Sequence, residues 1–142
     1  SGYGGPEVLF NAGLGGGSVG PGRLLVFALD EDASLPEPLP PLPPIAAPTF
    51  EVAATDAEIE QGGLLYLDSC LACHGFGAVS GGIVPDLRRT TAATHATFEQ
   101  IVLGGIRESL GMPRFDDLLD SEDVRLIQAY VLRRALESAG GN

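Results

Sequence analysis

The sequence predicts an all-α domain that is preceded by an extended strand and a proline-rich linker. Helix-capping residues, followed by apolar residues at helical spacing, begin at Thr55 and recur toward the C-terminus. Nine glycines lie in the first 22 residues, and seven of the eleven prolines lie between positions 36 and 48. We therefore expect three parts, which are residues 1–34, residues 35–54 and a helical domain over residues 55–142.

The composition argues against several classes of partner. The 142-residue chain has a formal net charge of −11, and all eight of its basic residues are arginines. Nucleic-acid binding requires a basic patch, so we expect no nucleic-acid partner. No apolar run approaches the ~20 residues that a membrane-spanning helix needs, and we expect no membrane span. Because the chain begins at Ser1 rather than at a methionine, we expect a processed product or a piece of a longer protein.

The first 34 residues combine a glycine-rich stretch with one strand. Gly15–Gly20 formally matches G-x-G-x-x-G, but Pro21-Gly22 follows where a dinucleotide site needs a helix, so we interpret the stretch as a loop. Arg23–Leu29 reads as a short buried strand, which ends at Asp30. One strand is not stable alone, and we expect it to belong to a sheet that lies mostly outside this chain.

Residues 35–54 are predicted to be a linker. A tract so rich in proline favours the polyproline II conformation, which extends ~3.1 Å per residue and acts as a semi-rigid spacer. A ligand for an SH3-like domain is the alternative interpretation of the same residues. We favour a spacer between two folded bodies, one to which residues 1–34 belong and one formed by residues 55–142.

A helix is predicted to begin after Thr55. Residues Thr55–Glu58 match a capping box, in which the threonine and glutamate side chains each bond to the backbone N–H of the other residue. Gly62-Gly63 lies inside this helix, where each glycine costs about 1 kcal/mol. We expect another helix to approach the pair closely, with Tyr130 of the last helix packed over it.

Two further helices are predicted. Thr97–Gln100 is a second box-like start, and Gly104-Gly105 ends or loosens the helix that follows it. The last helix is expected to start at Ser121, with acidic residues in its first turn, and to stop at Gly140-Gly141.

Residues Cys70–His74 read C-x-x-C-H, which is typical of covalent c-type haem attachment. Two thiols three residues apart on one turn can each add to a vinyl group on the same porphyrin edge. His74 then lies where a ring nitrogen can bind the iron. Haem attachment of this kind occurs outside the bacterial cytoplasm, so the motif predicts one covalent haem c and a periplasmic location.

Other interpretations of the two cysteines are weaker. A thioredoxin-like redox pair needs a βαβ context, which this sequence does not predict. A structural zinc site needs four ligands, and the sequence has no second Cys/His pair. A short-range disulfide would leave His74 without a role.

Pro85 and Met112 are the candidates for completing the iron site. A ligating histidine needs an acceptor for its other ring N–H, and the backbone carbonyl of Pro85 is our candidate, with a plain turn proline as the alternative. Met112, the only methionine, lies between Gly111 and Pro113 in an expected loop, and we predict that its sulfur is the sixth iron ligand. His95 is the rival ligand.

Four arginines flank the predicted haem loops: Arg88, Arg89, Arg107 and Arg114. Arginine suits bidentate pairing with carboxylates such as the haem propionates. We name Arg88 and Arg114 as candidate haem contacts, and a solvated arginine is the alternative for each.

Residues 55–138 resemble a class I cytochrome c. The resemblance is carried by Gly62, Tyr66, Cys70–His74, Pro85, Met112 and Tyr130. More narrowly, the chain resembles the C-terminal end of a quinohaemoprotein alcohol dehydrogenase. The matching stretches are Gly2–Gly5, Pro21–Leu29, the proline tract, Pro85–Arg88, Gly111–Phe115 and Asp123–Arg125.

This resemblance implies a larger assembly. Members of the family join an eight-bladed β-propeller, which holds pyrroloquinoline quinone (PQQ) and calcium, to a small cytochrome domain. The strand at Arg23–Leu29 would close the propeller. The haem would take electrons one at a time from the reduced quinone and pass them to a cytochrome, a cupredoxin or a membrane quinone. The resemblance also implies that this chain alone is not an alcohol-oxidising enzyme, since the quinone pocket, calcium ligands and catalytic aspartate lie elsewhere.

Two other functions stay open. The chain could be an independent soluble periplasmic cytochrome c that shuttles electrons. It could also carry a haem sensor or peroxidase-like site, in which the sixth iron position is open or exchangeable.

Overall fold

The computed structural model describes residues 37, 40, 42–80 and 84–140. The predicted strand at Arg23–Leu29 lies outside the described residues. Within the described residues every regular element is a helix, which confirms the predicted all-α class. None of these helices combines the length and the apolar character that crossing a bilayer demands.

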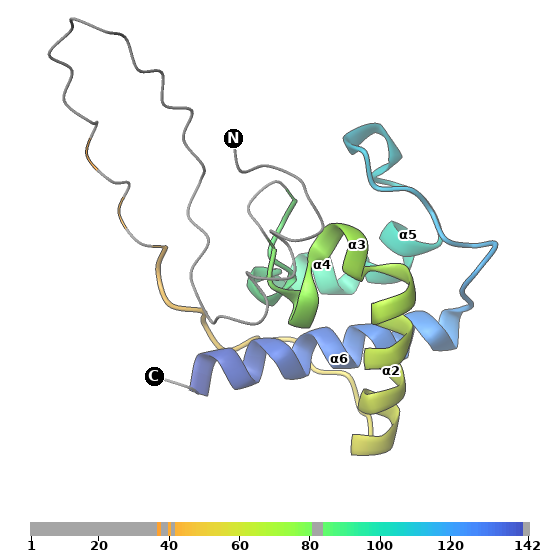
Figure 1. Cartoon of the computed structure of the whole chain (residues 1–142). Coiled ribbons are helices and arrows are strands. Elements are labelled where there is room, and N and C mark those ends of the chain that lie inside the picture. Colours follow the sequence, from red (N-terminus) through yellow and green to blue (C-terminus); the bar gives the residue numbers. More distant parts are fainter. Residues whose placement is uncertain (1–36, 38–39, 41, 81–83, 141–142) are drawn as a thin grey trace, which may run out of the picture.

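Two long helices form the frame of the domain. Helix α2 spans Asp56–Ser69 and crosses helix α6, which spans Ser121–Gly140 (Figure 1). The shorter elements that surround this pair are α3 (Leu71–His74), η1 (Phe76–Ala78), η2 (Leu87–Arg89), α4 (Ala92–Ala96), α5 (Phe98–Val102) and η3 (Glu108–Leu110).

Helix α2 begins with the predicted capping box. The backbone N–H of Glu58 donates to the Thr55 hydroxyl at 3.3 Å, and the Thr55 N–H donates to the Glu58 carboxylate at 2.7 Å. The bonds from Thr55, together with the nearby Arg125 guanidinium, lower the pKa of Glu58 to about 2. The carboxylate is therefore charged at neutral pH and holds the first turn of the helix.

The close approach predicted at Gly62-Gly63 is confirmed. A Cβ atom at Gly62 would lie 2.5 Å from the carbonyl carbon of Leu126 in α6, which leaves no room for any side chain. A Cβ at Gly63 would lie 3.2 Å from the ring of Tyr130. Gly62 therefore lets the backbones of α2 and α6 approach each other, and Gly63 makes room for the Tyr130 ring, which offsets the low helix propensity of the pair.

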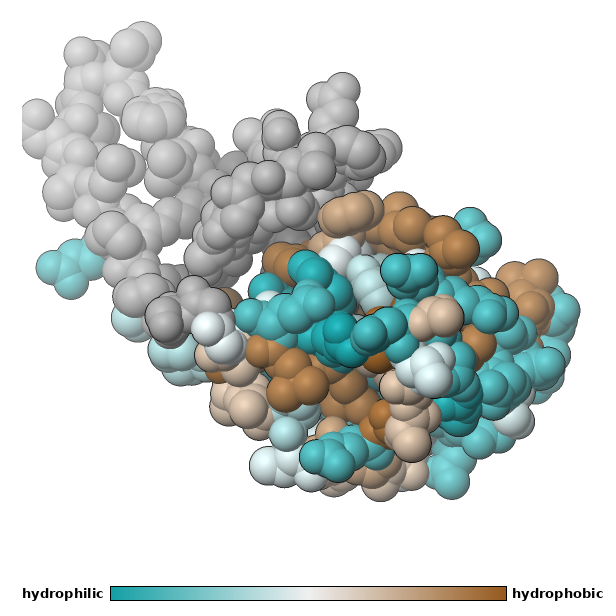
Figure 2. All heavy atoms as spheres, turned by 90° about the horizontal axis from the view of Figure 1, so that it is seen from below, coloured by the Kyte–Doolittle hydropathy of each residue, from teal (hydrophilic) through white to brown (hydrophobic). Residues whose placement is uncertain are grey.

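The core lies between these helices and α5. Its largest fully buried side chains are Tyr66, Val124, Ile127 and Val131, and Phe98 and Val102 of α5 pack against them. Several large apolar side chains remain exposed on different elements: Leu42, Leu64, Phe76, Ile106, Leu110, Leu118 and Leu136. On the face drawn in Figure 2, hydrophobic surface appears in separate groups among hydrophilic side chains.

The capping box predicted at Thr97–Gln100 is wrong, although α5 does start at Phe98. The Thr97 side chain makes no capping bond to α5. Its hydroxyl donates instead to the carbonyl oxygens of Ala93 and Thr94 at 3.3 Å, which end the preceding helix α4. The two short helices follow each other directly, so the threonine closes one rather than opening the other.

The described part of the predicted linker lies against the helical domain. Residues 42–54 contain no helix or strand. The ring of Phe50 stacks on His95 with the centroids 5.5 Å apart, and Arg125 donates to the carbonyl oxygen of Ala53 at 2.8 Å. Its last residues are therefore held by side chains of α4 and α6.

Candidate functional site

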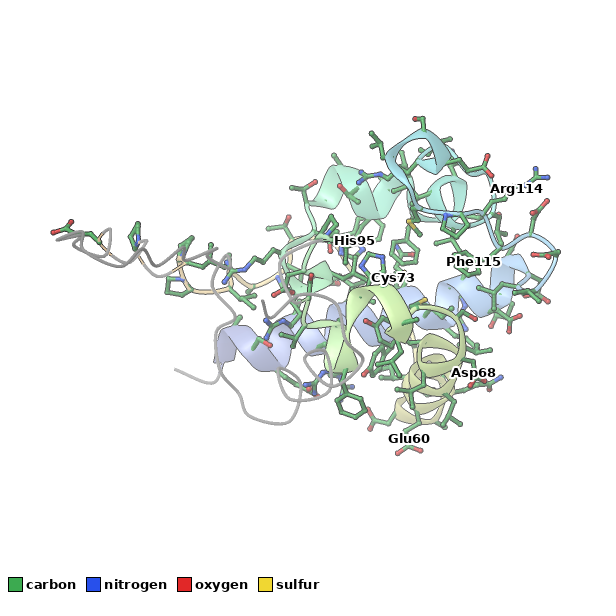
Figure 3. The ribbon with its side chains drawn as sticks, turned by 45° about the horizontal axis from the view of Figure 1, so that its top comes forward. Glu60, Asp68, Cys73, His95, Arg114 and Phe115 are labelled. Carbon is green, nitrogen blue, oxygen red and sulfur yellow. The ribbon has the colours of Figure 1, made fainter. Side chains whose placement is uncertain are left out.

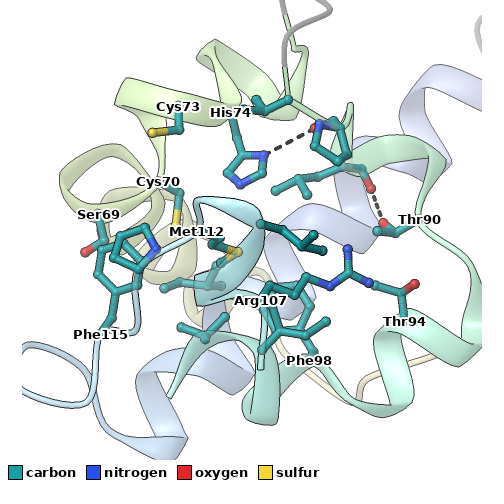
Figure 4. Close-up of a pocket in the computed structure, with 18 of the residues that line it drawn as sticks. Ser69, Cys70, Cys73, His74, Thr90, Thr94, Phe98, Arg107, Met112 and Phe115 are labelled. Atoms are coloured by element: carbon teal, nitrogen blue, oxygen red, sulfur yellow. Dashed lines mark hydrogen bonds between the residues drawn. The ribbon is translucent and has the colours of Figure 1, made fainter. Parts of the chain in front are cut away.

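An apolar cavity lies beside the cysteine motif, among α3, α5, α6 and the loop that follows η3 (Figure 4). We call it the central cavity. The residues that line it are Ser69, Cys70, Cys73, His74, Val84, Pro85, Leu87, Thr90, Thr94, Phe98, Ile101, Val102, Arg107, Leu110, Gly111, Met112, Pro113, Phe115 and Ile127. Most of these are apolar, so the cavity suits a large, mostly hydrophobic group with a few polar attachment points.

The two thiols are placed by the junction of α2 and α3. Cys70 ends α2, where its N–H donates to the carbonyl oxygen of Tyr66 at 2.9 Å, and the N–H of His74 donates back to Cys70 at 2.9 Å. This single turn puts both cysteines on the cavity, and both are free thiols. Burial raises the pKa of Cys70 to about 12, so it is protonated at neutral pH and poorly suited to thiol–disulfide exchange.

His74 is held in one orientation. Its Nδ1 lies 3.2 Å from the carbonyl oxygen of Pro85, which is the predicted contact. Burial lowers the pKa of His74, so the ring is neutral near pH 7. When Nδ1 carries the proton and donates a hydrogen bond to the Pro85 carbonyl oxygen, the lone pair of Nε2 is available to a metal ion.

A hydrogen bond from Tyr66 steadies the same loop. Its hydroxyl donates to the carbonyl oxygen of Gly75 at 2.7 Å in a buried position, directly after His74. Burial raises the pKa of Tyr66, which keeps the hydroxyl protonated and able to donate. The sequence placed Tyr66 in the first helix but carried no signal for this bond, because the partner is a backbone carbonyl nine positions away.

Met112 lines the cavity from the loop that follows η3, far in sequence from the cysteine motif. Gly111 precedes it with a φ of +90°, a left-handed conformation that favours glycine, and no atom lies within 4 Å of where its Cβ would be. The left-handed turn therefore accounts for a glycine at position 111. Figure 4 shows His74 and Met112 pointing into the same space from different elements.

The structure does not bring Arg88 or Arg114 into the central cavity. The Arg88 guanidinium pairs with Asp86 at 2.6 Å and donates to Ser138 at 3.2 Å. Arg114 pairs with Asp116 at 3.3 Å, with a side chain that is 58% exposed, and Figure 3 shows it at the edge of the domain.

His95 also lies outside the lining of the central cavity. It is buried, and its ring stacks between Phe50 and Phe98, with centroid distances of 5.5 and 5.9 Å. Gln128 donates to its backbone carbonyl at 2.7 Å. These contacts give the histidine a packing role between the linker and the domain.

The residues of the central cavity fit a covalently attached haem. Two thiols on one turn, a neutral imidazole held beside the Pro85 carbonyl and a thioether are the donor set that such a haem uses, and all of them line one apolar cavity. Five of the predicted site residues therefore lie together: Cys70, Cys73, His74, Pro85 and Met112.

Known proteins resemble this chain in sequence and in structure. Residues 57–131, just over half of the chain, match the family model described as "Cytochrome C oxidase, cbb3-type, subunit III". The quinohemoprotein alcohol dehydrogenase ADH IIB of Pseudomonas putida is 46% identical over 115 residues, which cover 81% of this chain and 17% of that enzyme. Cytochrome c550 of Pseudomonas aeruginosa is 36% identical over 83 residues, which cover 56% of this chain and 57% of that protein.

A solved structure agrees with these matches. The quinohemoprotein alcohol dehydrogenase ADHIIG of Pseudomonas putida HK5 superposes with a TM-score of 0.60 at 41% identity, over 73% of this chain and 15% of that one. The chain thus spans about a sixth of the dehydrogenases that it matches. Cytochrome c domains carry haem c and transfer electrons. The chain therefore belongs to the family of the cbb3-type subunit III cytochromes, and its helices form a class I cytochrome c domain similar to the C-terminal domain of quinohaemoprotein alcohol dehydrogenases.

Proposed function

We propose that this chain transfers electrons through one haem c, which is attached to Cys70 and Cys73 and ligated by His74 and Met112. One observation carries the proposal: a single apolar cavity gathers both thiols, the imidazole and the thioether. When bound, the haem supplies a one-electron couple between ferric and ferrous iron.

The protein residues around the haem would set its properties. The Pro85 carbonyl orients the His74 ring and increases its basicity as a ligand. Apolar walls, including Phe98, Ile101 and Val102, exclude water and disfavour the extra charge of ferric iron. With His74 and Met112 both bound, no iron position is left open for oxygen or for a substrate.

The electrons are proposed to come from PQQ. The relatives that share most of this chain are named quinohemoprotein alcohol dehydrogenases, and the chain covers only a small part of each. The donor would be a β-propeller that holds PQQ and calcium, and the acceptor an external cytochrome, cupredoxin or quinone in the periplasm. In this arrangement the propeller oxidises the alcohol, and this chain alone oxidises none.

An independent cytochrome shuttle is the second candidate. The observation that favours it is the match to cytochrome c550, more than half of which this chain covers. The two functions differ in their electron donor. Mixing the haem-loaded chain with a PQQ-loaded propeller distinguishes them, because a dedicated domain accepts electrons from the reduced propeller quickly, whereas a shuttle for other donors does not.

An optical spectrum of the purified full chain tests the haem assignment. We expect a c-type haemochrome in alkaline pyridine and, in the oxidised protein, the weak red band of a methionine–iron bond. A Cys70→Ser, Cys73→Ser double variant should lose the covalent haem. Covalent haem without the red band would contradict ligation by Met112, and protein that acquires no haem would contradict the whole proposal.

A further inference from the structure

Arg107 differs from the other arginines in its surroundings. Five of the seven arginines in residues 42–80 and 84–140 form ion pairs: Arg88 with Asp86, Arg114 with Asp116, Arg125 with Glu58 and Glu122, Arg133 with Asp56 and Arg134 with Glu137. Arg89 and Arg107 take part in none of these pairs. Of the two, Arg107 lines the central cavity, and among the described residues it is the only Arg, Lys, Asp or Glu in that lining.

Arg107 lies at a polar end of the cavity, away from the two thiols. Figure 4 shows Cys70 and Cys73 on one side, and the Arg107 side chain extending toward Thr94 on the other. Thr90 lines the cavity as well, and its hydroxyl donates to the carbonyl oxygen of Leu87. The cavity therefore has a thiol end and a cationic, hydroxyl-bearing end.

A haem has the same two-ended chemistry. Its vinyl groups, which react with thiols, and its two propionate carboxylates lie on opposite edges of the porphyrin. A haem joined to Cys70 and Cys73 consequently directs its propionates away from the thiols. A half-buried guanidinium in an apolar cavity favours an anionic partner, and a carboxylate matches its forked N–H groups.

We propose that Arg107 binds a propionate carboxylate of the haem, and that Arg88 and Arg114 do not. This inference rests on the proposed haem. The pair would orient the porphyrin in the cavity and offset negative charge near the iron. Without the guanidinium, the uncompensated carboxylate favours ferric iron over ferrous iron, and the reduction potential falls.

The test compares reduction potentials of the haem-loaded full chain across pH. We expect Arg107→Gln to lower the equilibrium constant for reduction about tenfold at pH 8, which is about 59 mV for a one-electron couple. The difference from the unchanged protein should shrink toward pH 5, because a propionate without a cationic partner protonates at higher pH and then no longer favours ferric iron. Arg107→Lys, which keeps the charge but not the fork, should fall between the two.

Arg114→Gln is the matched control, since it removes a guanidinium that lies outside the cavity, and its potential should stay that of the unchanged protein. The inference is overturned if Arg107→Gln has the same reduction potential as Arg114→Gln. It is also overturned if the potential of Arg107→Gln differs from that of the unchanged protein by the same amount at every pH, as a general loosening of the fold would produce. If Arg107→Gln does not accumulate, Arg107→Lys alone decides by the same pH comparison. Absence of haem from the unchanged protein overturns the proposed function and this inference together, whereas normal haem with an unresponsive potential overturns only the role of Arg107.

Discussion

The hydroxyl of Tyr66 donates a buried hydrogen bond of 2.7 Å to the carbonyl oxygen of Gly75, the residue that follows the proposed iron ligand His74. This bond ties helix α2 to the loop that leaves the cysteine motif. Gly75 directly follows His74, so the bond holds the backbone next to the imidazole whose Nδ1 lies by the Pro85 carbonyl oxygen. It is therefore a positioning contact that can be tested without touching the ligands themselves.

Replacing Tyr66 with phenylalanine should destabilise the fold. The substitution leaves the buried Gly75 carbonyl without its partner, and an unsatisfied buried acceptor costs about 1–3 kcal/mol. Urea unfolding of the haem-loaded chain measures the loss. Tyr130→Phe is the control, since the Tyr130 ring packs on Tyr66 with centroids 5.2 Å apart but its hydroxyl is not part of this bond. Equal losses in the two variants would contradict a specific role for the Tyr66 hydroxyl.

A methyl group at Gly62 should separate the two long helices. The Gly62→Ala Cβ would overlap the backbone of Leu126, which cannot rotate away, and overpacking of this kind costs about 1–3 kcal/mol or more. Gly63→Ala meets only the ring of Tyr130, which can shift, and alanine is a better helix former by about 1 kcal/mol. The midpoint temperature of thermal unfolding should therefore be well below that of Gly63→Ala in the Gly62→Ala variant. The reverse order would show that the crossing tolerates a side chain.

The stability of the domain should fall in acid through Glu58. Its folded pKa of about 2 is below the ordinary pKa of 4.5 for a glutamate, so its contribution to stability is present above pH 4.5 and is lost as the pH falls toward 2. Glu58→Gln should flatten the pH dependence of urea unfolding in this window. Glu60→Gln is the control on the same helix, where the side chain is exposed and points outward (Figure 3), and it should keep the slope. An unchanged slope in Glu58→Gln would contradict the role of the capping carboxylate.

Substituting Met112 should open the proposed iron site. Met112→Leu keeps the apolar volume but removes the sulfur, so covalent haem should remain while the red band disappears and carbon monoxide binds to the reduced protein. Absorption spectra with and without carbon monoxide measure both changes. Leu118→Ala, an exposed change outside the central cavity, should leave both properties unaltered. Retention of the red band in Met112→Leu would assign the sixth ligand to another residue.

Local signals in the sequence predicted local structure well. The capping box at Thr55 and the helical turn around Cys70 depend on residues within four positions of each other, and the structure confirms both. The box at Thr97 failed because a competing helix end, α4, lies immediately before it and takes the same hydroxyl. Arg88 and Arg114 were named for their nearness in sequence to the haem loops, yet acidic neighbours two residues away bind both guanidinium groups.

The sequence by itself determined the all-α class, the spacing of the thiols and His74, and the candidate ligand Met112, because helix caps and a C-x-x-C-H turn depend on fixed local geometry. Only the tertiary structure decided that Met112 and His74 share one cavity and that Gly62, unlike Gly63, faces the backbone of α6. It also decided that Arg107, rather than Arg88 or Arg114, lines the cavity. Those relationships join residues far apart in the chain. They depend on how elements that are distant in the sequence pack together, which local patterns do not specify in detail.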